Sequence, residues 1–328
     1  MSELKDLFDN LKVKDSEKSD LFLVEDIPGF ANHKIGISLD GLPIFFISTQ
    51  KSDSNALDVN LESIKVEFQK ICELINEQGE VKSGIYSIVY LKSNSEDIIK
   101  YFINTVFYVI KQLNVNPSFI ELKNELNNLV NLFRCLSNPP KKEIQGLWTE
   151  LLFIEIAKDP EYMIRCWHQN KSDRYDFNDG IDKIEIKSTR KNIRRHSFSA
   201  PQLLEISNSF ILIGSTFTVE TGTGICANDL LDKIAEKVHS PKLLMKLNII
   251  VAEIMGSNLE RINDTYFDYN LAVNEFKLYD INSIPSLNLL EIPSEITNIK
   301  FDCDLTNVEV ISKIQTDSKL INALFYWL

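Results

Sequence analysis

The chain has 328 residues, of which 44% are hydrophobic and 25% are charged, and its formal net charge is −12 at pH 7. This length and composition suit one large globular domain or two to three small ones with apolar cores. The acidic balance excludes a protein that coats nucleic acid by bulk electrostatics, because phosphate neutralisation needs Lys and Arg. Any nucleic-acid contact must therefore be a local basic patch.

The N-terminal stretch, MSELKDLFDNLKV, is polar and helical, unlike a signal peptide. No apolar run approaches the roughly 20 residues of a membrane span. The cysteines are scattered, without the spacing of zinc ligands, which indicates reduced core thiols: Cys72, Cys135, Cys166, Cys226 and Cys303. We therefore expect a soluble cytoplasmic protein with no membrane partner.

Strands dominate the first third of the chain. HKIGISL (33–39) and LPIFFIST (42–49) flank turn residues at Asp40 and Gly41, which predicts a hairpin, and GIYSIVYL (84–91) predicts another buried strand. Helical periodicity follows from Glu96 to Leu136, until SNPPKK (137–142) breaks it. The Pro139-Pro140 pair predicts a domain boundary.

The central region predicts an α-β-β-β-α-β unit. Its expected elements are a helix at 143–157, strands at 163–167, 174–178 and 183–188, a short helix at 199–205 and a strand at 209–219. Two amphipathic helices (228–238 and 241–255) and strand-like segments (275–281 and 307–314) follow. The prediction is a mixed α/β fold with a strand-rich then helical region at 1–137, a core at 138–220 and a C-terminal helical and β region at 221–328.

The stretch DRYDFNDGIDKIEIKSTRKN (173–192) reads as two strands joined at Asn178-Asp179-Gly180. Side chains alternate along a strand, so Glu185 and Lys187 share one face. With a two-residue loop Asp176 lies diagonal to Glu185, and with a four-residue loop it lies directly opposite. Either even loop places the three charges on one face, whereas an odd loop turns the strand over.

Two neighbouring carboxylates repel unless a cation sits between them. Carboxylates, a backbone carbonyl and waters suit Mg²⁺, with Mn²⁺ as a second option, and a nearby lysine can serve the attacking water. This pattern indicates metal-assisted phosphodiester hydrolysis. The alternative is a surface hairpin with a cross-strand Asp–Lys pair, which stabilises a fold by a few tenths of a kcal/mol.

Asp176 and the triplet at 185–187 resemble the PD-(D/E)XK nuclease superfamily. GLWTELLFI (146–154), RYDF, IEIKST and HSFSAPQLLE (196–205) resemble a bacterial family of PD-(D/E)XK motif proteins often found beside restriction-modification and phage-defence genes. The resemblance is strongest over about residues 143–220. Asp176 follows Tyr175, where the nominal motif has proline.

This resemblance implies roles for individual residues. Asp176 and Glu185 would bind metal, Lys187 would be the catalytic lysine, the carbonyl of Ile186 would be a further ligand, and Glu150 matches a helix glutamate of the superfamily. Periodicity leaves Glu150 and Glu155 open, because the helix is apolar on almost all sides. His168 and His196 are expected to be structural or on the surface.

A basic run, KIEIKSTRKNIRRH (183–196), adjoins this hairpin. We expect Lys191, Arg194 and Arg195 to contact DNA phosphates, with a solvated charged loop as the alternative. Gln202, in the short helix opening at Ser199, is expected to line the site.

The prediction is a Mg²⁺-dependent DNA endonuclease, type II restriction endonuclease-like, of a bacterial restriction-modification or phage-defence system. Further subunits of that system and homo-oligomers are possible partners. The alternative is a nuclease-like subunit that binds DNA or protein without cutting. RNA or a repair intermediate also stays open as the substrate.

Overall fold

The computed structural model describes residues 2–12, 22–52, 56–76, 78–140, 142–168, 173–204, 208–288, 292–293, 296–312 and 316–325. They form two compact units. The first unit comprises residues 1–141 and 244–261, and the second comprises residues 142–243 and 262–328. The three successive domains expected at 1–137, 138–220 and 221–328 remain a prediction, and the compact units differ from them because residues 244–261 return to the first unit.

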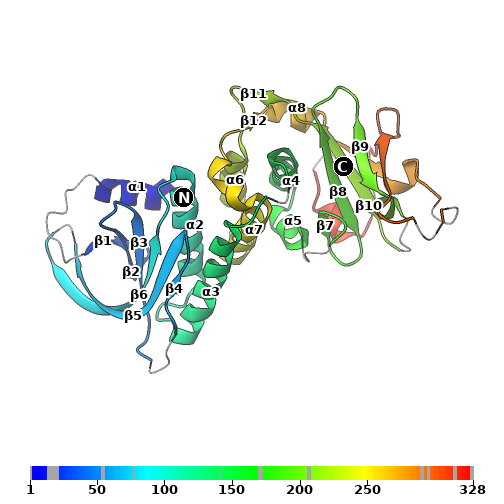
Figure 1. The fold of residues 1–328 in the computed structure, drawn as a ribbon. Helices are drawn as coiled ribbons and strands as arrows, with labels where there is room; N and C mark the ends of the chain where they lie inside the picture. Colours follow the sequence, from blue (N-terminus) through cyan, green and yellow to red (C-terminus); the bar gives the residue numbers. More distant parts are fainter. Residues whose placement is uncertain are drawn as a thin grey trace. The chain divides into compact units, whose positions relative to one another are not determined.

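The first unit combines a sheet with flanking helices (Figure 1). Its elements are α1 (Ser2–Lys12), β1 (Phe22–Ile27), β2 (Phe30–Ile37), β3 (Pro43–Ser48), β4 (Val59–Asn60), β5 (Ile64–Ile75), β6 (Val81–Leu91), α2 (Glu96–Gln112), α3 (Phe119–Cys135), most of α7 (Pro241–Met255) and the 3₁₀ segment η2 (Gly256–Arg261).

The strands of this unit pair, within the described ranges, in the order β1-β2-β3-β6-β5-β4. The start of β1 also pairs in parallel with the end of β5, so β1, β2, β3, β6 and β5 close into a ring. The predicted hairpin is confirmed: β2 and β3 are antiparallel, and the amide of Gly41 donates to the carbonyl of Ser38 in the turn. The predicted strand at 84–91 lies within β6.

Aromatic side chains join the sheet to its helices. The ring of Phe102 on α2 lies 5.6 Å from Phe45 on β3 and 5.8 Å from Phe133 on α3. The helical region predicted from 96 to 136 is confirmed as two helices, because α2 ends at Gln112 and α3 begins at Phe119. Pro117 lies in the break, and Ser118 caps α3 by accepting a hydrogen bond from the amide of Glu121.

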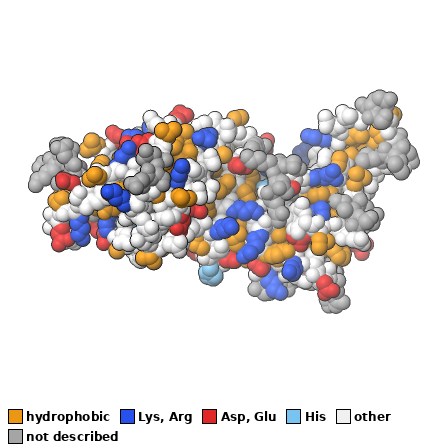
Figure 2. Space-filling model, turned by 90° about the horizontal axis from the view of Figure 1, so that it is seen from below, with side chains coloured by type: hydrophobic (Ala, Val, Ile, Leu, Met, Phe, Trp, Pro, Cys, Tyr) orange, Lys and Arg blue, Asp and Glu red, His pale blue; other side chains and the backbone are white. Residues whose placement is uncertain are grey.

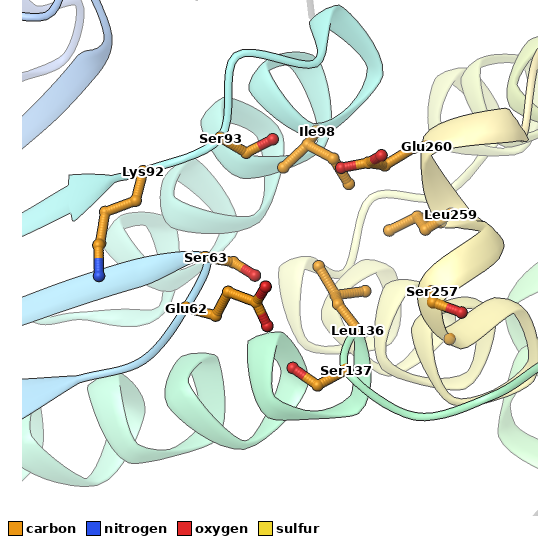
Figure 3. A pocket seen from close by; sticks show the side chains of 11 residues that line it. Glu62, Ser63, Lys92, Ser93, Ile98, Leu136, Ser137, Ser257, Leu259 and Glu260 are labelled. Carbon is orange, nitrogen blue, oxygen red and sulfur yellow. The ribbon is translucent and has the colours of Figure 1, made fainter.

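The first unit also contains a pocket of about 420 Å³. Figure 3 shows its lining, which mixes charged, serine and apolar side chains: Glu62, Ser63, Lys92, Ser93, Ile98, Leu136, Ser137, Gly256, Ser257, Leu259 and Glu260. The backbone of Gly256 has φ +50°, and a side-chain carbon at this position would lie 2.2 Å from the carbonyl oxygen of Asn138. Glycine is therefore required where η2 meets the end of the α3 segment.

The second unit carries shorter strands and several helices (Figure 1). Its elements are α4 (Ile144–Ile156), α5 (Pro160–Cys166), β7 (Phe177–Asn178), β8 (Lys183–Thr189), β9 (Arg195–Ser199), η1 (Ala200–Leu203), β10 (Ile211–Phe217), β11 (Glu220–Thr221), α6 (Ala227–Lys237), the start of α7, β12 (Tyr266–Phe267), α8 (Tyr269–Asn274), β13 (Lys277–Asp280), η3 (Ile281–Ser283), β14 (Lys300–Asp304) and α9 (Lys319–Asn322).

The larger sheet of this unit has the order β13-β10-β8-β7 within the described chain. Strands β8 and β10 are parallel, and β7 and β13 are antiparallel to their neighbours. Helix α4 is apolar on nearly all sides because it is buried in the core, where the ring of Phe153 lies 5.1 Å from Phe177 and 5.3 Å from Phe276. The mixed α/β fold class is confirmed.

Two predicted strands of this unit are wrong. Residues 163–167 fall largely in helix α5, because Asp159 accepts a hydrogen bond from the amide of Tyr162 and Pro160 occupies the first turn. Residues 307–312 form no strand, and 313–314 lie outside the described residues. The strand in this region is β14, which pairs with β9.

The observed order between 144 and 217 is therefore α4-α5-β7-β8-β9-η1-β10. The strands expected at 183–188 and 209–219 are present as β8 and β10, and the one expected at 174–178 is reduced to β7. The short helix is present as η1, while residue 205 lies outside the described residues. The complete α-β-β-β-α-β arrangement stays a prediction.

The amphipathic helices α6 and α7 and the strand β13 are confirmed near their predicted positions. All five cysteines are free thiols, and four of them are buried. Among the described residues, no helix combines the length and the apolar composition that a membrane crossing requires.

Candidate active site

Helix α4 carries two buried glutamates with different surroundings. Glu150 Oε1 lies 2.7 Å from Lys142 Nζ, while its Oε2 accepts a hydrogen bond of 2.8 Å from Trp167 Nε1. Glu155 is instead held by Lys237 Nζ at 2.7 Å and by the Tyr269 hydroxyl at 2.6 Å. Of the two glutamates that the sequence left open, Glu150 is the one beside Asp176, through the ammonium of Lys142.

The β7–β8 hairpin sets the position of Asp176. Asn178 pairs with Lys183 and Phe177 with Ile184, so the loop has the four residues 179–182, which is the longer of the two even loops considered. Gly180 in this loop has φ +96°, a conformation that favours glycine. Continuing the register by one residue places Asp176 opposite Glu185.

Backbone contacts hold Asp176 in this place. Its Oδ2 accepts a hydrogen bond of 2.8 Å from the amide of Ile186, and its carbonyl accepts one of 2.9 Å from the amide of His168. The amide of Ile186 therefore faces Asp176, and the role expected for the carbonyl of Ile186 stays a prediction.

Glu185 and Lys187 are in direct contact. Lys187 Nζ lies 2.6 Å from Glu185 Oε1, which also accepts a hydrogen bond of 2.7 Å from Gln202 Nε2. Gln202 is itself fixed, because its Oε1 accepts a hydrogen bond of 2.9 Å from the amide of Ser199 at the start of η1. The amide of Gln202 thus orients the carboxylate of Glu185, and its expected role in lining the site stays a prediction.

Two further residues belong to this cluster and were missed from the sequence. His168 Nε2 lies 2.8 Å from Glu150 Oε2, and Lys142 Nζ lies 3.0 Å from Asp176 Oδ1. His168 was expected to be structural or on the surface, because a lone histidine is more often so than catalytic and no Ser or Cys partner lies at motif distance. Its backbone has φ +40°, which is uncommon for a residue with a side chain and often marks a functional position. Lys142 carries no sequence signal beyond its place after Pro139-Pro140.

Burial and the repulsion of a neighbouring carboxylate shift Asp176 and Glu185, but not Glu150, toward their protonated forms. Burial, reinforced by the charge of Asp176, raises the pKa of Glu185 to about 8. Burial and the charge of Glu150 likewise raise the pKa of Asp176. For Glu150, burial acts in the same direction, but the hydrogen bond to His168 and the ammonium of Lys142 outweigh it and lower its pKa to about 2.

These residues fit a divalent cation. Glu150, His168 and Asp176 each offer one ligand atom, and these three atoms lie within 4.8 Å of one another. The raised pKa values of Asp176 and Glu185 come first from burial and then from a neighbouring carboxylate, so a cation bound beside these groups would favour their charged forms. Carboxylate oxygens suit Mg²⁺, and the imidazole nitrogen adds a ligand that suits Mn²⁺ and other transition ions better.

The three basic residues expected to contact DNA differ in their exposure to solvent. Lys191 and Arg195 are exposed, and Arg195 Nη2 lies 3.8 Å from Asp304. Arg194 is buried, with hydrogen bonds to the carbonyl of Ser215 at 2.9 Å and to Glu275 Oε2 at 2.9 Å. Because the guanidinium of Arg194 is buried and bonded to Ser215 and Glu275, it is poorly placed to contact a DNA phosphate.

His196 is also structural: it is buried and lies 2.7 Å from the hydroxyl of Ser215. The residues lining the pocket of the first unit include no member of the Glu150–His168–Asp176 group, which is the only such group found among the described residues. The candidate active site therefore lies in the second unit.

Comparison with known proteins identifies the family. Residues 4–306 match the family described as "Putative PD-(D/E)XK family member, (DUF4420)". No curated protein and no solved structure matches the chain significantly. The family match spans nearly the whole chain, including both compact units and all the residues of the cluster. The chain therefore belongs to this PD-(D/E)XK family, as its hairpin motif predicted.

Proposed function

We propose that this protein is a divalent-metal-dependent DNA endonuclease whose active site is the cluster around Asp176 and Glu185. The observation that carries the proposal is the convergence of buried acidic groups with a lysine at the hairpin of a chain of this family. Asp176 and Glu150 are bridged by Lys142, and Glu185 is bound to Lys187. A surface hairpin with an exposed ion pair would not bury Asp176 and Glu185 to about 5% exposure.

Asp176, Glu185, Glu150 and the carbonyl of Ile186 are the proposed ligands of Mg²⁺ or Mn²⁺, with His168 Nε2 as a further ligand atom. The chemistry that such an ion supplies is polarisation of the phosphate and acidification of an attacking water. Gln202 keeps the carboxylate of Glu185 in one orientation. The proposed role of Lys187, whose ammonium contacts Glu185, is to hydrogen-bond the attacking water and to stabilise charge developing on the phosphate.

The proposed setting is a bacterial restriction-modification or phage-defence system in the cytoplasm, with a type II restriction endonuclease-like reaction. The support for this setting is the resemblance of the motif segments to proteins encoded beside such systems. Other subunits of the system, or further copies of this chain, are proposed partners.

A non-cleaving DNA- or protein-binding subunit is the second candidate. The observation that favours it is Lys142, whose ammonium already bridges Glu150 and Asp176 without a metal ion. Cleavage of plasmid and linear DNA with Mg²⁺, with Mn²⁺ and with EDTA separates the two functions. A nuclease cuts only with the metal, whereas a binding subunit retains DNA equally well under all three conditions and cuts under none. Methylated and unmethylated DNA, and RNA, belong in the same assay.

Lys187→Ala is the sharpest test of the mechanism. The substitution leaves the proposed carboxylate ligands in place, so metal binding should persist while cleavage falls by about 10²-fold or more. Lys183→Ala is the matched control, because it removes the same charge from β8 at a residue that contacts Ser209 rather than the cluster. A folded Lys187→Ala protein that cuts DNA as fast as the parent would show that the lysine is structural.

A further inference from the structure

The ammonium of Lys142 lies where the candidate metal ligands converge. Its Nζ is 2.7 Å from Glu150 Oε1, 3.0 Å from Asp176 Oδ1 and 3.4 Å from His168 Nε2. These three residues form the group whose ligand atoms lie within 4.8 Å of one another. One nitrogen of Lys142 thus contacts an atom of every member of that group.

The second carboxylate oxygens of Glu150 and Asp176 already have hydrogen-bond partners. Glu150 Oε2 accepts from Trp167 Nε1 and contacts His168 Nε2, and Asp176 Oδ2 accepts from the amide of Ile186. Among the described residues, Lys142 Nζ is the side-chain donor at hydrogen-bond distance from both Glu150 Oε1 and Asp176 Oδ1. A metal ion that binds these two oxygens, at about 2.0–2.6 Å, would therefore meet the ammonium in the same space.

Exposure indicates which partner can move. The side chain of Lys142 is 36% exposed, whereas those of Glu150 and Asp176 are 4% and 8% exposed. Lys142 also precedes α4 and its N-cap residue Glu143, outside any helix or strand, while Glu150 is fixed within α4. A flexible four-carbon stem can carry the ammonium into solvent, but the carboxylates cannot leave without disrupting the core.

We propose that Lys142 is a resident cation of this site, and that binding of a divalent metal ion proceeds by displacement of its ammonium. The inference rests on the proposed function, because it concerns the same metal site. Lys142 holds the carboxylates together when the metal is absent, and it weakens metal binding by competing for the same two oxygens. Neutralising Lys142 therefore strengthens metal binding and destabilises the metal-free protein.

The test is Mn²⁺ binding to the full-length chain, measured by the electron paramagnetic resonance of free Mn²⁺, for the parent and for Lys142→Met. We expect Lys142→Met to bind Mn²⁺ at least tenfold more tightly and to melt at a lower temperature in EDTA. Lys237→Met is the matched control, because Lys237 binds the other buried glutamate of α4, Glu155. It should leave the Mn²⁺ affinity unchanged. Unchanged or weaker binding by Lys142→Met would overturn the inference.

A measurement on the parent protein covers the case in which Lys142→Met does not fold. Displacement exposes the amine of Lys142, so acetylation by an amine-reactive reagent, followed by mass spectrometry, should accelerate severalfold when Mn²⁺ saturates the protein. The labelling of Lys237 should not change. Equal or slower labelling of Lys142 with Mn²⁺ counts against displacement.

The outcomes distinguish this inference from the proposed function. A parent that binds Mn²⁺ and cuts DNA, with a Lys142→Met variant of equal affinity, overturns the inference alone. If neither protein binds Mn²⁺ and the parent does not cut, both fail. Binding by Lys142→Met but not by the parent supports the competition of Lys142 with the metal ion but overturns its displacement in the parent.

Discussion

Glu150 and Glu155 are the same residue type, five positions apart on one buried helix, yet their neighbours give them different chemistry. Glu155 is satisfied by Lys237 and Tyr269, which complete an internal ion pair and hydrogen bond. Glu150 contacts Lys142 and His168, which also border Asp176. The first arrangement stabilises the fold, and the second assembles possible metal ligands.

Replacement of each glutamate by glutamine should separate these two roles. Glu150→Gln removes a charged ligand and should weaken Mn²⁺ binding by at least tenfold. Glu155→Gln should leave Mn²⁺ binding unchanged but lower the free energy of unfolding by about 1–3 kcal/mol, since a charge-assisted hydrogen bond is lost. Mn²⁺ titration and urea denaturation measure the two effects. An equal loss of Mn²⁺ affinity in both variants would contradict the assignment of Glu150 to metal binding and of Glu155 to stability.

His33 in the first unit provides a pH-dependent contribution to stability. Burial, aided by the charge of Lys34, lowers the pKa of His33 to about 4. Its Nδ1 accepts a hydrogen bond of 3.2 Å from the amide of Ser48, which a neutral ring can do. The unfolded chain, with the ordinary value of 6.5, binds a proton more readily, so stability is lost as pH falls from about 6.5 through 4.

His33→Asn should reduce this acid sensitivity, because the amide oxygen of asparagine can accept from Ser48 without titrating. Between pH 7 and pH 4 the parent should lose about 3 kcal/mol more unfolding free energy than the variant. Urea denaturation across this range, followed by a probe of the first unit, measures the difference. The exposed His239→Asn provides the control and should follow the parent. Identical pH profiles for the parent and His33→Asn would contradict the assignment.

At the scale of the elements, two neighbouring arginines at the start of β9 differ in burial. Arg194 precedes the strand and is buried against Ser215 and Glu275, and Arg195 begins the strand and is exposed. Arg194→Met should lower the unfolding free energy by about 2 kcal/mol, because the carbonyl of Ser215 loses its donor while the partly exposed Glu275 is solvated. Arg195→Met should cost no more than about 0.5 kcal/mol. Equal costs in urea denaturation would contradict this assignment.

Local patterns predicted the part of the site that depends on local geometry. The alternation in 183–188 places Glu185 and Lys187 on one face, and the turn residues at 178–180 predict the hairpin. The four-residue loop of the structure is what adds Asp176 to that face. Asp159 and Pro160, which precede the segment 163–167, are a local signal for the start of a helix that the strand prediction did not use.

Other features depend on pairings that are distant in the sequence. Strand β9 pairs with β14, about one hundred residues later, so the run 191–196 read as a basic loop. The burial of Arg194 was also not evident from the sequence, because its partner Glu275 is far from it along the chain. Lys142 and His168 reach the site through the fold. An antiparallel backbone bridge joins Trp167 to Phe177, and it brings His168 to the hairpin and to Glu150 on α4. No periodicity within a single element reports such contacts.

At the scale of the whole molecule, the charge of −12 limits how DNA can be held. On the face in Figure 2, basic and acidic side chains are interspersed rather than segregated into one basic band. A DNA contact therefore needs a few well-placed cations, for which Lys191 and Arg195 are exposed candidates that follow Lys187 in the sequence.

Joint replacement of Lys191 and Arg195 by alanine should weaken duplex binding and flatten the slope of log affinity against log salt by ~1.8, or ~0.9 for each lost phosphate contact. Fluorescence anisotropy at several salt concentrations, with EDTA to prevent cleavage, gives the slope. Replacement of two exposed lysines of the first unit, Lys51 and Lys82, removes the same net charge and serves as the control. Equal slopes in the two double variants would assign these cations to a solvated surface.

The return of residues 244–261 to the first unit determines how this gene can be divided. Helix α7 begins in the second unit and continues into the first, where the carbonyl of Asn248 accepts the buried hydroxyl proton of Tyr101 at 2.6 Å. A fragment ending at residue 141 would lack this partner, and a fragment starting at residue 142 would expose the apolar side chains of α7 that the first unit covers. No single cut yields two intact cores. The nuclease-like unit therefore cannot be transplanted by simple fusion, and recombination at one junction would damage both halves.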